Sequence, residues 1–172
     1  SITGEVWDES NEAALQAAKK NKMTYVHPFA DARVIQGQGT IALEVIKSVP
    51  ELDTLVVAVG GGGLIGGVAT AAKSMKPNIQ VIGVEPVGAP THFKSRAAGK
   101  GIKLDKSDTQ AGTLAPKKTE TLNFELIQKH VDDLILVDDI SMQKAAEWLW
   151  FEFGVAAELS GAASIAALSD KV

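Results

Sequence analysis

Four consecutive glycines are the residues whose type and spacing point most directly to chemistry: Gly60, Gly61, Gly62 and Gly63. An apolar run at 54–59 precedes them and predicts a buried strand, whereas the residues from Leu64 onward predict a helix. Because glycine has no Cβ atom, the backbone N–H groups of such a bend can close around an anion. The helix start adds unpaired N–H donors and a positive dipole end. The sequence therefore predicts a phosphate-binding bend.

The glycines alone leave the phosphate ligand open. Gly61, Gly63 and Gly66 have the spacing of a dinucleotide-binding fingerprint, and Glu85 ends the next apolar run. This fingerprint is a weak signal by itself, because any glycine-rich run matches it easily. The sequence contains no Gly-Lys-Ser/Thr segment, which excludes a Walker-type nucleotide loop.

Strands and helices are expected to alternate around this bend. Strands are expected at 24–26, 52–59, 80–85 and 134–137, and helices at 8–21, 41–47, 64–76, 91–98, 120–130, 141–153 and 160–168. Continuous apolar strands are typical of a parallel sheet that is covered on both faces. We therefore expect an α/β fold, a mainly parallel sheet with helices on both faces in three layers. The polar stretch 100–118 is expected to be a long loop near the site.

Composition narrows the class of protein. The chain has 172 residues, 45% of them hydrophobic, which is enough for a globular domain with a core. The net charge of -4 and the mixed signs along the chain argue against nucleic acid as a partner. The absence of cysteine excludes disulfides and a cysteine nucleophile. No apolar run approaches the roughly 20 residues of a membrane span, and residues 1–6 have no signal-peptide pattern, so a cytoplasmic protein without a membrane partner is expected.

Several segments together resemble the threonine dehydratase and serine racemase family of pyridoxal 5′-phosphate enzymes, which have fold type II. They occur in the family's order along essentially the whole chain, at 26–29, 34–45, 59–67, 81–86 and 131–133. The resemblance implies that pyridoxal phosphate is the cofactor and that its phosphate is bound by the glycines at 60–63, next to Leu64. It favours this cofactor over a dinucleotide, because several independent segments agree.

The resemblance also implies a reaction. In the family, the cofactor ring withdraws electrons while the α-proton of a hydroxy amino acid leaves. The β-hydroxyl group is then eliminated, and the products are a 2-keto acid and ammonia. The expected function is thus that of a threonine or serine dehydratase-type lyase with a small amino-acid substrate. Members of the family are often dimers or tetramers, so a homo-oligomer is expected.

The central departure from the family concerns the lysine that holds the cofactor covalently. The family carries this lysine in a Ser-Phe-Lys-x-Arg-Gly segment, and no such segment precedes Pro28. Residues 1–28 resemble the end of the family's small domain, and 29–172 resemble its large cofactor domain, incomplete at both ends. No catalytic residue is therefore identified, and the chain alone is expected to be inactive. Lys94 lies in a similar-looking segment but is interpreted as a solvated helix residue.

Two cofactor-binding positions and one cation site follow from the resemblance; Glu158 is kept, whereas Thr113 and Thr91 depart from the family's pattern. Thr113 stands where the family has a glycine against the cofactor, and Glu158 where it has a carboxylate near the cofactor ring. The family's cation site is matched by Glu85 and by the backbone carbonyl of Ala89, but its third, acidic position is Thr91. Because hard cations prefer several oxygen ligands, carboxylates among them, we expect only weak cation binding.

A second hypothesis from a different class remains open. The chain could be a non-catalytic module that binds a phosphate ligand or a dinucleotide, as a pseudoenzyme does. The missing lysine segment favours this hypothesis, whereas the ordered match to the family favours a lyase. Elsewhere, His27 is interpreted as a hydrogen-bonded structural residue, and the aromatic residues at 148–153 are expected to lie mainly in the core.

Overall fold

The computed structural model describes residues 3–4 and 7–169. Their strands and helices alternate from β1 onward, as predicted. The elements are α1 (Trp7–Asn21), α2 (Ala32–Ser48), β1 (Thr54–Ala58), α3 (Gly63–Met75), β2 (Gln80–Pro86), α4 (Thr91–Ala98), the short 3-10 helix η1 (Gly112–Leu114), α5 (Thr121–His130), β3 (Asp133–Val137), α6 (Asp139–Phe153) and α7 (Leu159–Ser169).

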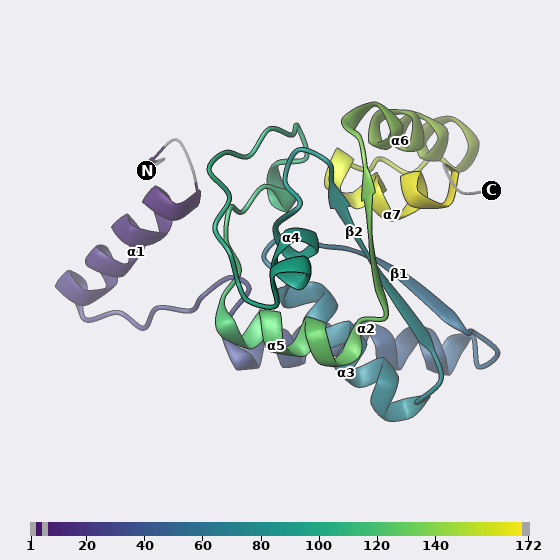
Figure 1. The fold of residues 1–172 in the computed structure, drawn as a ribbon, viewed down its shortest axis with the longest axis horizontal. Helices are drawn as coiled ribbons and strands as arrows, with labels where there is room; N and C mark the ends of the chain where they lie inside the picture. The colour runs from purple at the N-terminus through teal and green to yellow at the C-terminus, as the bar shows by residue number, and fades with distance from the viewer. Residues whose placement is uncertain (1–2, 5–6, 170–172) are drawn as a thin grey trace.

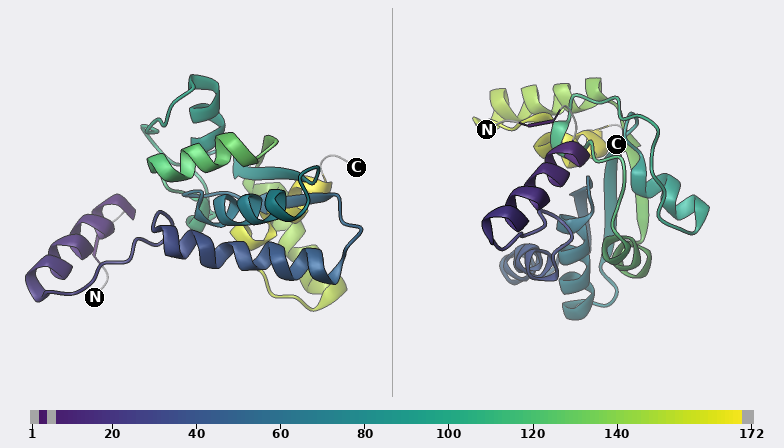
Figure 2. Two further views of the ribbon diagram at one scale, coloured as in Figure 1. Left: turned by 90° about the horizontal axis from the view of Figure 1, so that it is seen from below. Right: turned by 90° about the vertical axis from the view of Figure 1, so that its left-hand side faces the viewer.

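The three strands form one parallel sheet in the order β1-β2-β3. Helices α2, α3 and α5 lie on one side of the sheet, and α6 and α7 lie on the other (Figures 1 and 2). This arrangement confirms the predicted α/β class with helices on both faces. Among the described residues, no helix is both long and apolar enough to cross a membrane.

Burial on both faces explains the continuous apolar sequence of β1. Side chains of a strand alternate between the two faces. Leu55 and Val57 pack into the core under α2 and α3, whereas Val56 and Ala58 pack into the core under α6 and α7. Each position from 55 to 58 therefore contacts a hydrophobic layer, and no polar residue is needed between them.

Helix α2 begins nine residues before the predicted start at Ile41. Asp31 caps it by accepting a hydrogen bond of 2.9 Å from the backbone N–H of Arg33. Gly39, which precedes the predicted helix at 41–47, lies inside α2, and a Cβ atom there would be 3.1 Å from the carbonyl oxygen of Gly67 in α3. Gly39 therefore allows α2 and α3 to pack closely.

Three other expectations about the elements were wrong. No strand forms at 24–26, where the backbone lacks a partner strand among the described residues. Helix α6 begins at Asp139 instead of Ser141, because Asp138 caps it by accepting the backbone N–H of Ser141 at 2.7 Å. Its aromatic residues are not in the core: Trp150 is 56% exposed and Phe151 is 79% exposed. Small residues of α6 face α7, which turns the aromatic side outward.

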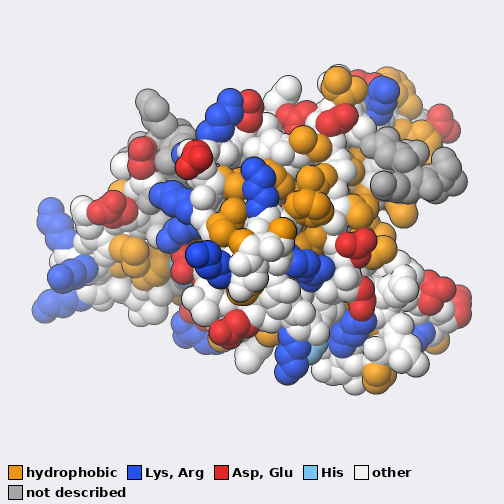
Figure 3. All heavy atoms as spheres, viewed as in Figure 1, with side chains coloured by type: hydrophobic (Ala, Val, Ile, Leu, Met, Phe, Trp, Pro, Cys, Tyr) orange, Lys and Arg blue, Asp and Glu red, His pale blue; other side chains and the backbone are white. Residues whose placement is uncertain are grey.

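The described surface carries charges of both signs. Figure 3 shows Lys and Arg interspersed with Asp and Glu on one face, without a stripe of a single sign.

Helix α1 lies to one side of the sheet, and residues 22–31 connect it to α2 (Figure 1). The ring centroids of Trp7 and Phe29 are 4.7 Å apart, so this contact ties α1 to the connection. Residues 1–2 and 5–6 lie outside the described residues. They are part of the expected small-domain segment and of the stretch 1–6 in which no signal-peptide pattern was found.

Candidate functional site

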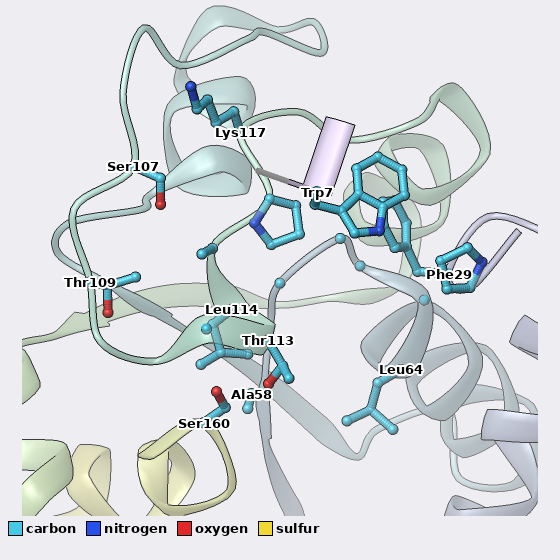
Figure 4. A pocket seen from close by; sticks show the side chains of 18 of the residues that line it. Trp7, Phe29, Ala58, Leu64, Ser107, Thr109, Thr113, Leu114, Lys117 and Ser160 are labelled. Atoms are coloured by element: carbon cyan, nitrogen blue, oxygen red, sulfur yellow. The ribbon is translucent and has the colours of Figure 1, made fainter. Parts of the chain in front are cut away.

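A cavity of about 910 Å³ opens where β1 ends in the glycine bend, which we define as residues 60–63. Open parallel sheets bind ligands at the carboxyl ends of their strands. Trp7 and Phe29 form one wall, the loop from Lys106 to Lys117 forms the opposite wall, and the start of α7 closes the base (Figure 4). The predicted long loop therefore contributes directly to the cavity.

The backbone of the bend presents free donors to this cavity. Gly62 has φ +93° and caps α3 without any side-chain hydrogen bond. Among the described residues, no hydrogen bond is donated by the backbone N–H groups of Gly60, Gly61, Gly63 or Leu64, or by that of Gly62 itself. These donors meet the requirement for binding an anion, because the start of α3 adds the positive end of its dipole.

Glycine is required at the bend mainly by the protein behind it. A Cβ atom on Gly60 would be 2.4 Å from the carbonyl oxygen of Thr113, and one on Gly61 would be 2.4 Å from Cδ2 of Phe29. Real Cβ atoms do not approach so closely, since core packing leaves no such overlap. The missing side chains thus let the bend pack against its support, while the N–H groups remain available.

The structure brings together all the residues that the sequence proposes for cofactor binding. The glycine bend, Leu64, Thr113 and Glu158 all line the cavity. Oγ1 of Thr113 donates a hydrogen bond of 3.3 Å to Oε1 of Glu158, and Oε2 of Glu158 accepts the backbone N–H of Ser160 at 3.0 Å. Glu158 therefore holds the first turn of α7 against η1. Whether these residues contact a cofactor stays a prediction.

Sequence reasoning missed other residues of this region. Phe29 lines the cavity and packs against the bend, and Ser160 lines it with a buried hydroxyl group that has no partner among the described residues. Asn123 and His92 lie behind the bend, on the side away from the cavity lining. Only the type of Ser160, a polar residue at a helix start, gave any local signal; the others are brought in by the fold.

Glu85 is completely buried and supports the first turn of α4. Its Oε1 accepts the backbone N–H of His92 and its Oε2 accepts that of Phe93, both at 2.7 Å. Burial raises the pKa of the Glu85 carboxyl to about 7, although these two hydrogen bonds oppose the rise. A buried carboxylate that caps a helix cannot reach a ribose in the cavity. The dinucleotide fingerprint therefore lacks its acidic partner.

The cation site proposed at Glu85 and Ala89 stays a prediction. The carbonyl oxygen of Ala89 accepts the backbone N–H of Thr91 at 2.9 Å. Both Glu85 oxygens already accept hydrogen bonds from α4. Within the described part of the chain, no group of three or more His, Cys, Asp or Glu side chains is arranged to hold a metal ion.

His92 lies directly beneath the glycine bend. A Cβ atom on Gly62 would be 2.8 Å from Cε1 of the imidazole. Burial lowers the pKa of His92 to about 4, and the carbonyl groups of Gly61 and Gly60 oppose this change. The imidazole is therefore neutral at pH 7 and fills the space behind the bend without adding a charge.

Two other interpretations concern lysine and histidine. Lys94 is exposed on α4 and is not among the residues that line the cavity, as expected for a solvated helix residue. His27 accepts hydrogen bonds at Nδ1 from the backbone N–H groups of Phe29, at 3.3 Å, and Ala30, at 3.0 Å. It stabilises the turn that leads to α2, which agrees with a structural role.

Comparisons with known proteins identify what the whole chain is similar to. The profile of the family described as "Pyridoxal-phosphate dependent enzyme" matches residues 2–172. The chain is 40% identical to L-threonine ammonia-lyase from Thermotoga maritima, over 99% of the chain and 43% of the relative. It is 41% identical to serine racemase from Oryza sativa subsp. indica, over 99% of the chain and 50% of the relative.

A solved structure gives the same result for the fold. Maize serine racemase superposes with a TM-score of 0.92 and 37% identity, covering 98% of this chain and 53% of the maize chain. The chain thus spans about half the length of the relatives that it matches. Sequence profile, sequence identity and three-dimensional similarity agree over nearly all of the 172 residues.

Proposed function

This chain belongs to the family of pyridoxal-phosphate-dependent enzymes, and we propose that it forms the phosphate-binding part of a threonine or serine dehydratase-type ammonia-lyase. The single observation that carries the proposal is the set of N–H groups at the glycine bend that have no acceptor among the described residues, because the residues that carry them line a cavity large enough for a cofactor. A phosphate ester fits these donors, because it offers several strong acceptor oxygens and a negative charge.

Different residues of the chain bind the phosphate and the ring of the cofactor in this proposal. The N–H groups of residues 60–64 hold the phosphate, and Phe29 supports the bend from one side. Thr113 and Glu158, which share a hydrogen bond, both line the cavity, where a hydroxyl and a carboxylate can orient the polar edge of a ring. When bound, pyridoxal phosphate supplies an electron sink for the carbanion that forms at the α-carbon of an amino acid.

The substrate proposal rests on the relatives. The curated relatives include an L-threonine ammonia-lyase and a serine racemase, both named for hydroxy amino acids. We extend this substrate class to the present chain and propose β-elimination, with a 2-keto acid and ammonia as products. No segment like the one that carries the family's lysine precedes Pro28, and the similar-looking segment around Lys94 lies on α4, outside the cavity lining. The proposal therefore assigns phosphate binding, and not the covalent step, to the described residues.

The proposed division into two parts follows the shape of the chain. The small-domain segment, residues 1–28, includes α1, which lies to one side of the sheet in Figures 1 and 2. The cofactor-binding part, residues 29–172, includes the sheet and the cavity walls apart from Trp7 and Pro28. The ring contact between Trp7 and Phe29 joins the two parts at the cavity.

The alternative of a dinucleotide-binding module is not favoured. It requires an acidic side chain at the end of β2 that faces the ligand. Glu85 occupies this position and is fully buried against α4. The comparisons also point to the pyridoxal-phosphate family and to threonine and serine enzymes.

Calorimetric titration of the purified protein with pyridoxal phosphate, pyridoxal and NAD tests the proposal. The expected result is that pyridoxal phosphate binds at least about tenfold more tightly than pyridoxal, because only the former carries the phosphate that the bend holds. Treatment with borohydride is expected to leave Lys94 unlabelled. Equal affinity for pyridoxal and its phosphate, or tighter binding of NAD, would refute the proposal.

A further inference from the structure

One buried side chain connects the glycine bend to the rest of the protein. Asn123, in the first turn of α5, is 0% exposed. Its Nδ2 donates two hydrogen bonds, of 2.8 Å to the carbonyl oxygen of Gly61 and of 2.7 Å to that of Phe29. These contacts join three segments, because the two acceptors lie 62 and 94 residues away from Asn123 along the chain.

The orientation of the Asn123 amide follows from its neighbours. Both nearby groups are carbonyl oxygens, which accept hydrogen bonds and do not donate them. The NH₂ group must therefore face the bend, and the opposite atom, Oδ1, is buried without a partner among the described residues. Leaving Oδ1 unpaired costs stability. The two hydrogen bonds to the carbonyls are made in spite of this cost.

Because the peptide group between Gly61 and Gly62 is planar and trans, the hydrogen bond from Asn123 to the Gly61 carbonyl also sets the direction of the Gly62 N–H. The C=O of one residue and the N–H of the next point in opposite directions. The described chain has no cis peptide bond. Holding the carbonyl oxygen of Gly61 toward α5 therefore turns the N–H of Gly62 away from α5, toward the side where the bend lines the cavity.

Glycine makes such a support necessary. A glycine backbone visits many conformations that other residues avoid, so a bend of four glycines does not fix its own peptide planes. Two other groups lie behind the bend, but their contacts are weaker. Oγ1 of Thr119 is 3.5 Å from the carbonyl oxygen of Gly61, and neither ring nitrogen of His92 has a hydrogen-bond partner in the part of the chain that the structure describes.

We propose that Asn123 is a positioning residue for phosphate binding: it holds the Gly61 carbonyl so that the N–H of Gly62 is pre-oriented toward the anion. The inference rests on the proposed function, since it assumes that the phosphate of pyridoxal phosphate lies at the bend. Pre-oriented donors bind an anion without the cost of ordering the loop first. Asn123 does not contact the ligand and acts only through the peptide group between Gly61 and Gly62.

The test compares N123L with the unmodified protein. Leucine has nearly the shape of asparagine but cannot donate a hydrogen bond. Calorimetry with pyridoxal phosphate and with pyridoxal gives the ratio of the two affinities, which measures phosphate recognition and not general stability. We expect N123L to weaken binding of pyridoxal phosphate by about tenfold to a hundredfold and to leave pyridoxal binding unchanged. L126A, which shortens a side chain one turn further along α5 that does not line the cavity, is the control and should keep the ratio.

The outcomes separate the inference from the proposed function. If the unmodified protein does not distinguish the two ligands, the proposed function fails. If it distinguishes them and N123L does so equally well, only the positioning role fails. If circular dichroism shows that N123L does not fold, titration of the ¹⁵N-labelled unmodified protein with inorganic phosphate takes its place. The Gly62 amide and the Asn123 NH₂ resonances should then shift together, and an unshifted Gly62 amide overturns the inference.

Discussion

The buried pair of Glu85 and His92 makes the pH dependence of stability a sharp test of the structure. The pKa of Glu85 is raised from 4.5 to about 7, so the folded protein retains a proton that the unfolded chain loses. Stability from this group is present below pH 4.5 and is lost as the pH rises through 7. The pKa of His92 is lowered from 6.5 to about 4, which has the opposite effect: its stability is present above pH 6.5 and is lost as the pH falls through 4.

The two effects cancel over most of their range. Between pH 4.5 and 6.5, the folded state holds one proton more on Glu85 and one fewer on His92 than the unfolded state. Each group alone changes the free energy of unfolding by about 1.4 kcal/mol per pH unit. For these two groups, the unmodified protein is therefore expected to show a nearly constant free energy of unfolding between pH 4.5 and 6.5.

The substitution E85Q removes one of the two effects. Glutamine does not titrate, so only His92 remains, and the free energy of unfolding should rise by about 3 kcal/mol from pH 4 to pH 6.5. Urea unfolding followed by tryptophan fluorescence at half-unit pH steps measures this slope. E125Q, which changes an exposed glutamate on α5, is the control and should keep the profile of the unmodified protein. A profile for E85Q that rises no more steeply than that of the unmodified protein would show that the reasoning about the buried pair is wrong.

Two further substitutions test the packing of the bend and the start of α6. G60A places a Cβ atom 2.4 Å from the carbonyl oxygen of Thr113 and should lower the free energy of unfolding in urea by about 1–3 kcal/mol. The control G37A, in an open part of α2, should raise it by up to about 1 kcal/mol. Equal effects of the two substitutions would contradict the packing argument. D138A removes the side-chain acceptor of the Ser141 N–H at the start of α6 and should lower the free energy of unfolding by about 1 kcal/mol at pH 7. D138N, which keeps an acceptor oxygen, should lose much less. A loss below about 0.3 kcal/mol for D138A would contradict the capping role.

Local sequence features predicted the elements that carry their own signal. The apolar runs identified β1, β2 and β3, and the glycines between an apolar run and a helix located the bend. These features act over a few residues, because the apolar pattern of a strand, a helix cap and a glycine bend are each written in neighbouring residues. Where a local signal had two physical meanings, prediction failed. Gly39 lies outside the helix predicted at 41–47, but in the structure it lies inside α2, where it allows contact with α3.

The sequence alone therefore determined the class of fold, the position of the glycine bend and the resemblance to the family. Only the tertiary structure decided what surrounds the bend. Phe29, Asn123 and His92 carry no local signal of a role there, because their contacts with the bend are made across the fold. The tertiary structure also decided that Glu85 supports α4 instead of facing a ligand. The physical reason is that the direction of a side chain or a carbonyl depends on which segments pack together, and not on residue type or spacing alone.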